Sequence, residues 1–313
     1  SEDQFCMPKK YIGNLIHLIQ AIINDKDNAN KEAFVALLDF EKAFDSVNHE
    51  FTFAAMKAFG IPEECSRFTR LAFIKTSACC IVNGQRTEYF PLPGGGRQGD
   101  NLYPLLFCIV LQVMNIAINM QGLKGIDIDD TNTAKLGQYA DDTTVFGIGH
   151  DDYVKLRTGI ALFEKASGMN VNWDKSLIIK LGKEFPLLEN DTIEILPHGQ
   201  KTRVLGVMMG HEEDITEGWI KLYDKLKNTV CNKVRSVNSQ TGDTLTMNTV
   251  AISSANFVAS FQSIIPPARI LKLEPKVNKF IRNKTYLISL AKRCSSSKDG
   301  QIIPSLKLQD VKP

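Results

Sequence analysis

Short apolar runs alternate with polar segments over the first 210 residues and predict a body that mixes helices and strands. The run at 34–40 reads FVALLDF, which is typical of a buried strand with Asp39 near its carboxyl end. Asn48 is placed to cap a helix over 49–59, which Gly60 and Pro62 close. The same reasoning predicts a helix that carries Tyr153, Leu156, Ile160 and Phe163 and ends at Gly168, strands over 169–173, 177–181 and 204–208, and a loop-rich insertion over 184–200.

Two β-hairpins are predicted where polar turns separate apolar runs. The dipeptide Asn83-Gly84 lies between candidate strands over 78–82 and 87–91, and it is a strong signal for a tight hairpin turn. A second hairpin is expected over 135–148, with Ala140-Asp141-Asp142 at its turn. This turn places two adjacent carboxylates at a hairpin tip.

The longest apolar segment, over 102–120, is long enough to imitate a membrane span. It contains Pro104, and the polar residues Gln112, Asn115 and Asn119 recur at helical spacing along one face. A core helix with one polar stripe explains this pattern better than a span does, so we expect no association with a membrane.

Charge is distributed unevenly although the chain as a whole carries only +2. From Gly218 onward there are 16 Lys and Arg against 5 Asp and Glu, a net +11, whereas the preceding part has 21 basic and 30 acidic residues, a net −9. Apolar spacing beyond Gly218 predicts helices, among them 244–261 and 267–282. A basic helical lobe after an α/β body indicates a polyanionic partner for this part of the chain.

The overall composition, with 43% hydrophobic and 23% charged residues, excludes wholesale disorder, collagen-like structure and a coiled coil. Seven scattered cysteines without a CxxC pair fit reduced thiols in an intracellular protein better than a disulfide framework. The five histidines are equally dispersed, which argues against a zinc site. No signal peptide follows Ser1, and we expect the chain to be an internal part of a longer polypeptide.

Asp39 at a strand end and Asp141-Asp142 at a hairpin tip are the candidate catalytic residues. Adjacent carboxylates repel each other unless a cation lies between or opposite them. Two Mg²⁺ ions would supply that charge, and a pair of ions can activate an attacking hydroxyl and stabilise a leaving pyrophosphate. A polar turn without catalytic function is the alternative, and the dipeptide alone favours it.

The sequence around these aspartates favours a catalytic role over a polar turn. Residues 34–49 read FVALLDFEKAFDSVNH, residues 96–107 read GRQGDNLYPLLF, and residues 139–142 read YADD. In this order and spacing they resemble motifs A, B and C of reverse transcriptases, specifically those of non-LTR (LINE-type) retrotransposons. Further matches are SGMNVNWDKS at 167–176 to motif D, VLGV at 204–207 to motif E, DQFCMPKK near the start, and DGQIIPSLKLQD near the end.

The resemblance implies an α+β right-hand polymerase with fingers, a palm built on an antiparallel sheet and a helical thumb. We expect partial fingers and palm over 1–210, the thumb over 211–290 and a post-thumb segment over 291–313. The implied function is RNA-directed DNA synthesis by two-metal nucleotidyl transfer from a dNTP to a primer 3′-hydroxyl. The implied partners are an RNA template, a DNA primer or nicked target DNA, and dNTP, which places the protein in the nucleus.

The resemblance also implies roles for individual residues. Asp39 and Asp141 hold the two Mg²⁺ ions, with Asp142 assisting and Mn²⁺ able to substitute, and Lys175 donates a proton to pyrophosphate. The nucleotide-binding residues are Phe40, Phe44, Arg97, Gln98 and Gly99, with Phe44 as the gate against a 2′-hydroxyl, and Leu205 and Gly206 form the primer grip. On the last predicted thumb helix Lys272, Lys276 and Lys279 lie opposite the apolar stripe, as a face for nucleic-acid backbone or merely a solvated one.

The sequence departs from the family pattern in motif B, where Asn101 and Tyr103 replace a proline and a serine. The N-terminal fingers block does not precede Ser1, and no endonuclease signature is seen. Group II intron maturases and telomerase-like enzymes are the nearest rivals, but RQGD at 97–100 favours the LINE type over maturases, which tend to have QGG. An inactive, domesticated RNA-binding scaffold is an alternative of another class. Loss of one of the metal-binding aspartates would indicate such a scaffold, and none is missing here.

Overall fold

A computed structural model of the chain describes residues 4, 10–25, 27–73, 76–92, 94–97, 99–189, 191–197, 199–210, 257, 260 and 261. Two compact units divide the chain, Ser1–Lys201 and Thr202–Pro313. The helices predicted beyond Gly218 and the expected boundaries at 210 and 290 lie outside the described residues or are not decided by them, so they stay predictions.

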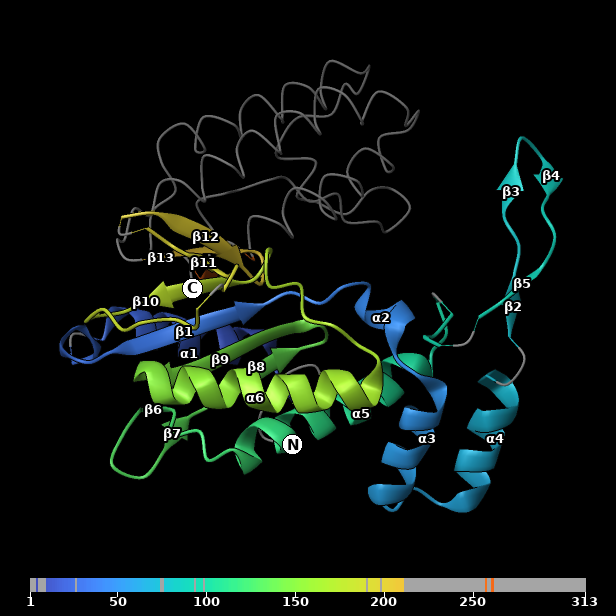
Figure 1. The fold of residues 1–313 in the computed structure, drawn as a ribbon, viewed down its shortest axis with the longest axis horizontal. Helices are drawn as coiled ribbons and strands as arrows, with labels where there is room; N and C mark the ends of the chain where they lie inside the picture. The colour runs from blue at the N-terminus through green and yellow to red at the C-terminus, as the bar shows by residue number, and fades with distance from the viewer. Residues whose placement is uncertain are drawn as a thin grey trace, which may run out of the picture. The chain divides into compact units, whose positions relative to one another are not determined.

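A five-stranded sheet forms the centre of the first unit, in the order β11-β10-β1-β9-β8 (Figure 1). Its central strand is antiparallel to both neighbours, and β8 is antiparallel to β9, while the edge strand β11 runs parallel to β10. The strands span Ala33–Leu38 (β1), Leu136–Tyr139 (β8), Asp142–Ile148 (β9), Leu177–Lys180 (β10) and Glu194–Ile195 (β11). With the helices below, this sheet confirms the predicted α+β class.

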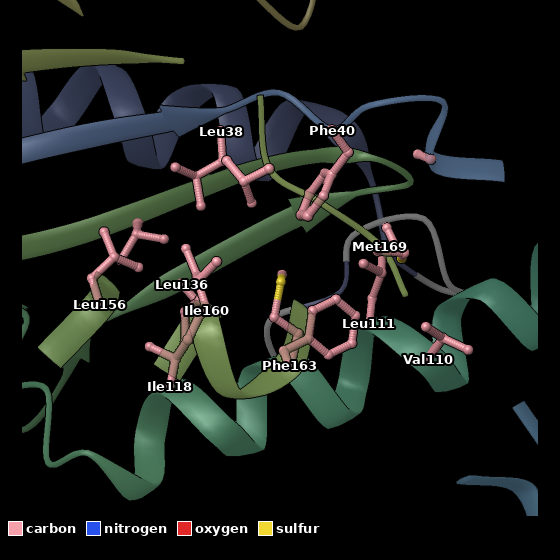
Figure 2. Packing of buried hydrophobic residues seen from close by; sticks show 14 of the residues in the cluster. Leu38, Phe40, Val110, Leu111, Ile118, Leu136, Leu156, Ile160, Phe163 and Met169 are labelled. Atoms are coloured by element: carbon pink, nitrogen blue, oxygen red, sulfur yellow. The ribbon is translucent and has the colours of Figure 1, made fainter. Parts of the chain in front are cut away.

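Both faces of the sheet are covered, which is why β1 is an almost uninterrupted apolar run. Phe34, Ala36 and Leu38 share a core with the helices α5, Tyr103–Met120, and α6, Gly149–Ser167. Figure 1 shows α5 and α6 side by side against the sheet, and Figure 2 shows Leu38 and Phe40 pointing toward them. Val35 alternates to the opposite face, on the side where α1, Ile12–Asn24, packs beside β8.

The long apolar helix α5 is the one described helix with the length and composition of a membrane span. Half of it is buried inside the protein, where it packs against α3, His49–Ala58, and α6. Leu106, Val110 and Met114 belong to the central core cluster. This burial agrees with the predicted core helix.

The remaining described elements are a 3-10 helix, two helices and four pairs of strands. They are the 3-10 helix η1 (Asn28–Asn30), the helices α2 (Ala43–Ser46) and α4 (Glu63–Phe73), and the paired strands β2 (Ser77–Ala78) with β5 (Phe90–Pro91), β3 (Ile81–Val82) with β4 (Gln85–Arg86), β6 (Ile126–Asp127) with β7 (Thr133–Ala134), and β12 (Lys201–Val204) with β13 (Val207–Gly210). Asn48 caps α3 as predicted, accepting hydrogen bonds from the amides of residues 50 and 51. The predicted hairpin at Asn83-Gly84 is also present, with both residues at positive φ.

Two predicted strands are wrong. Residues 169–173 make one isolated bridge, Val171 with Phe40, and the chain turns at Trp173, while the Val171 amide donates to the Glu164 carboxylate. Residues 204–208 are not one strand, since Leu205 and Gly206 adopt positive φ, 49° and 88°, and form the turn between β12 and β13.

Candidate active site

The candidate metal-binding aspartates meet at one end of the central sheet. Strands β1 and β9 pair as far as Leu38 with Thr143, so the register continued by one residue sets Asp39 opposite Asp142. Asp39 and Asp142 are therefore adjacent in space although about a hundred residues separate them in sequence. Like charges directly opposite each other on antiparallel strands destabilise the pairing.

Asp141 lies in the two-residue turn that joins β8 to β9, between the paired residues Tyr139 and Asp142. Ala140, the other residue of the turn, has a φ of 53°, a left-handed conformation that a residue with a Cβ rarely adopts. Such strain persists where the surrounding structure imposes it, which is frequent at functional sites. The hairpin holds two consecutive carboxylates at the sheet end that also carries Asp39.

The three carboxylates influence one another electrostatically. The pKa of Asp142 is raised above its ordinary value, first by partial desolvation and then by the negative charges of Asp141 and Asp39. A raised pKa means that ionisation of Asp142 is disfavoured in the folded protein. A cation at this end of the sheet would relieve that repulsion.

The donor set fits a divalent ion that is shared with a substrate. Within the described part of the chain, no three acidic, histidine or cysteine side chains enclose a ready-made ion site. Magnesium prefers a few carboxylates together with substrate phosphates and water, so exposed aspartates at a sheet end suit it without such a cage.

Lys175 lies on a turn next to Asp39. Residues 170–172 run antiparallel to residues 39–41, and the Asn172 amide donates to the Asp39 carbonyl at 2.8 Å. The chain then turns through 173–175, where the Lys175 side chain is exposed to solvent. The fold thus brings the predicted proton donor to the sheet end that carries the aspartates.

Phe44 is half-buried on α2, a short helix just beyond Asp39. Its ring stacks on Phe107 of α5 with the centroids 4.4 Å apart and the planes 20° apart, and it also contacts Tyr103 at 5.9 Å. One side of the ring is therefore held by core aromatics. This packing is compatible with either predicted role, a sugar gate or a core residue.

The glycine run before α5 packs directly against the segment that carries Phe44. The amides of Gly95 and Gly96 donate to the carbonyls of Val47 and Phe44 at 2.8 and 2.9 Å. A Cβ on Gly95 would lie 2.5 Å from the Asp45 Cα, so a side chain cannot be accommodated there. The close approach explains why this loop, which begins motif B and packs against motif A, is glycine-rich.

The other predicted site residues have varied positions. Arg97 is exposed and pairs with Asp100 at 3.6 Å, and Gly99 has a φ of 89°. Phe40 is buried in the core, so its ring does not face solvent (Figure 2). Gln98, Lys272, Lys276 and Lys279 lie outside the described residues, and the turn residues Leu205 and Gly206 belong to the second unit.

Residues 4–209 match the profile of the family described as "Reverse transcriptase (RNA-dependent DNA polymerase)". That range covers about two thirds of the chain and contains all three aspartates. The chain belongs to the reverse transcriptase family.

Curated relatives of this reverse transcriptase are retrotransposon proteins. The chain is 28% identical over 216 residues to the Pol polyprotein of the type-1 retrotransposable element R2 of Popillia japonica, covering 63% of this chain and 30% of that protein. It is 23% identical over 162 residues to the type-2 R2DM polyprotein of Drosophila melanogaster, covering 52% and 15%. These relatives confirm the non-LTR retrotransposon type, and the chain spans less than a third of their length.

Solved structures show the same fold. Telomerase from Candida tropicalis in complex with the TWJ fragment of telomeric RNA gives a TM-score of 0.53 at 11% identity, covering 99% of this chain and 49% of that chain. The apo telomerase from the same organism gives 0.50 at 12% identity, covering 90% and 51%. At such identities the likeness concerns the polymerase fold alone, while the sequence relatives are retroelements.

A buried polar network beside the YADD turn could not be foreseen from the sequence. Asn115 of α5 donates to the Gln138 side chain at 2.9 Å, and Gln138 donates to the Thr143 hydroxyl at 3.3 Å. Gln138 and Thr143 are paired across β8 and β9, one step from the YADD turn. The polar stripe on α5 signalled an inward-facing Asn115, but its partners could not be found without the fold.

We predict that Asn115→Ala destabilises the reverse transcriptase by about 1–3 kcal/mol, because the buried Gln138 oxygen loses its donor. The measurement is the free energy of unfolding from a urea titration. Gln121→Ala, at the residue that caps the carboxyl end of α5, is the control, since its side chain donates to the Ala117 carbonyl and is less buried. Equal losses in both variants would show that the network adds nothing specific.

Proposed function

We propose that this chain is the polymerase core of a retrotransposon protein, which copies RNA into DNA by extending a primer 3′-hydroxyl with dNTP. The observation that carries the proposal is the placement of Asp39 opposite Asp142 and beside Asp141, within a matching family profile. Reverse transcriptases use divalent metal ions. We infer that Mg²⁺ is the ion here, with Mn²⁺ able to substitute, because exposed carboxylates plus phosphate oxygens suit Mg²⁺.

In the proposed mechanism Asp39 and Asp141 hold two ions and Asp142 assists. Bound metal would supply activation of the primer hydroxyl and neutralisation of the charge that develops on the leaving pyrophosphate. Lys175 is exposed on the turn beside Asp39 and is proposed to protonate the departing pyrophosphate.

The remaining roles concern substrate binding. Arg97, Gln98 and Gly99 are proposed to contact the incoming nucleotide and template, with Phe40 at the nucleotide site through its place next to Asp39 and Phe44 as the sugar gate. Leu205 and Gly206 are proposed to hold the primer, because a tight turn presents its backbone to a nucleic-acid strand. Each of these roles is open to separate mutation.

The proposed partners are an RNA template, a DNA primer and, for the longer protein, nicked chromosomal DNA as the priming target. Chromosomal priming would require the protein to work in the nucleus. The telomerase structure bound to a telomeric RNA fragment supports RNA binding by this fold.

A primer-extension assay tests the proposed function. Purified protein, a homopolymer RNA template, a DNA primer and dNTP are incubated with Mg²⁺, with EDTA or with no divalent ion. We expect metal-dependent extension on RNA. RNA binding without extension, by protein whose three aspartates are intact, would support the inactive scaffold instead.

The basic face predicted on the last thumb helix gives a second test. We expect that changing Lys272, Lys276 and Lys279 together to glutamine weakens binding of an RNA–DNA duplex and lowers the salt slope by about 2–3, since each lost phosphate contact removes about 0.7–0.9 from it. The measurement is duplex affinity against salt concentration. A control triple change of Lys225, Lys227 and Lys233 matches the change in charge. An unaltered slope in the first variant would show that its lysines are only solvated.

A further inference from the structure

Ser176 makes a hydrogen bond that sets it apart from other residues of the turn beside Asp39. Its hydroxyl oxygen accepts a hydrogen bond from the Asp39 amide at 3.1 Å, and the hydroxyl donates one to the Asn172 carbonyl at 2.8 Å. Ser176 is 1% exposed, so water does not replace either interaction. The hydroxyl thus joins the backbone of a proposed metal ligand to the turn that carries Lys175.

The position of Asp39 explains why such a bond is needed. Strand β1 pairs with β10 only as far as Leu37 with Leu177, and with β9 as far as Leu38 with Thr143. Beyond these pairs the Asp39 amide donates to the Ser176 hydroxyl instead of to a neighbouring strand. The Asp39 carbonyl is bonded on the other side by the Asn172 amide.

We propose that Ser176 is a positioning residue for polymerisation, which holds Asp39 at the distance from Asp141 and Asp142 that a shared metal ion requires. The inference rests on the proposed function, because it assumes that Asp39 binds metal. Groups that orient a metal ligand typically change metal affinity or activity by about 10- to 100-fold when they are removed. Ser176 acts through Asp39 and does not itself touch substrate.

The chain contains a matched control for this hydroxyl. Ser167 is also buried, at 0% exposed, and its hydroxyl oxygen also accepts a backbone amide at 3.1 Å, that of Met169. Both serines lie within the same ten-residue motif D segment. Ser167→Ala therefore removes a bond of the same kind and burial without touching Asp39.

The experiment compares Ser176→Ala, Ser167→Ala and wild type by three measurements. Hydrogen exchange at the Asp39 amide is compared with the Val35 amide in the middle of β1, Mn²⁺ affinity is measured by EPR without nucleotide, and the Mg²⁺ dependence of primer extension is recorded. In Ser176→Ala we expect at least tenfold faster exchange at residue 39 alone, about 10- to 100-fold weaker Mn²⁺ binding, and a higher Mg²⁺ requirement. Ser167→Ala should change none of the three.

Normal Mn²⁺ affinity in a folded Ser176→Ala variant, or an equal loss in Ser167→Ala, would overturn the inference. If Ser176→Ala fails to fold, Ser176→Cys replaces it with the same expectations, because a thiol fills similar space but is a weak acceptor. Asp39→Asn separates the two hypotheses. If it leaves Mn²⁺ binding and extension intact, the proposed function fails; if it abolishes both while Ser176→Ala does not, only the positioning role fails.

Discussion

Changing Asp141 to asparagine is expected to abolish primer extension, with at least a roughly thousandfold loss of kcat, while the palm stays folded. A neutral amide fills the same space in the hairpin turn but is a poor ligand for Mg²⁺, which prefers carboxylate oxygens. A thousandfold loss corresponds to about 4 kcal/mol of activation free energy, which is within what metal stabilisation of a transferring phosphoryl group supplies. The measurement is single-turnover primer extension on RNA with saturating dNTP.

Stability provides the control for this substitution. The charge of Asp141 is one cause of the raised pKa of Asp142, so the folded protein disfavours two ionised carboxylates there. An acid whose pKa is raised on folding costs stability above its unfolded pKa, and that cost disappears as the pH falls below it. In EDTA at neutral pH, Asp141→Asn should therefore be at least as stable as wild type, and the difference should vanish in acid.

Two outcomes would contradict the assignment. Extension at near wild-type rate by folded Asp141→Asn protein would remove Asp141 from the metal site. A clear drop in Tm in EDTA would show that the aspartate is needed for the turn itself. Asp142→Asn is the companion variant, for which we expect a smaller loss of activity because Asp142 is proposed to assist.

Elements with a strong local signal could be predicted from the sequence. The apolar run of β1, the Asn48 cap of α3 and the Asn83-Gly84 turn each depend on neighbouring residues alone, and each is present. The meeting of Asp39 with Asp141 depends instead on the pairing of β1 with β9, a contact between distant segments. The pattern of apolar and polar residues does not predict which strands pair. The resemblance to reverse transcriptases implied that these aspartates act together.

The two wrong predictions have different physical causes. Alternating apolar residues at 169–173 and 204–208 satisfy the strand pattern, but a strand also needs a partner along its length and extended backbone at every residue. Val171 finds a partner residue only in Phe40 and gives its amide to the Glu164 side chain. Leu205 adopts a positive φ because it lies in a hairpin turn. The alternation of apolar residues gives no sign of this conformation.

The hydroxyl of Ser176 and the amide of Asn115 were beyond prediction for a related reason. Each supports the site through a hydrogen bond to a residue more than twenty positions away, Asp39 in one case and Gln138 in the other. A buried serine or asparagine shows in sequence as a polar residue among apolar ones. The partner, which decides what the residue does, is visible only in the fold.

Changing Phe44 to alanine is expected to lower discrimination between dNTP and rNTP by about 10- to 100-fold. The ring is half-buried and rests with one side on Phe107, so core contacts hold it in place beyond Asp39. As a gate, it would pack against a deoxyribose, whereas a 2′-hydroxyl would clash or lose its water without a new partner. The measurement is kcat/KM for dNTP and for the matching rNTP, in wild type and in Phe44→Ala.

A core role predicts a different result, and a second phenylalanine separates the two. Phe163 of α6 is buried in the same core cluster and makes its ring contact with Phe51 rather than with Phe44. Phe163→Leu should lower stability and slow both substrates alike, leaving the dNTP-to-rNTP ratio unchanged. Truncation of a fully buried phenylalanine to alanine costs about 3–5 kcal/mol, and half-buried Phe44 should lose less. If Phe44→Ala instead lowers Tm strongly while the ratio stays at the wild-type value, its ring is a core residue and sugar selection depends on another side chain.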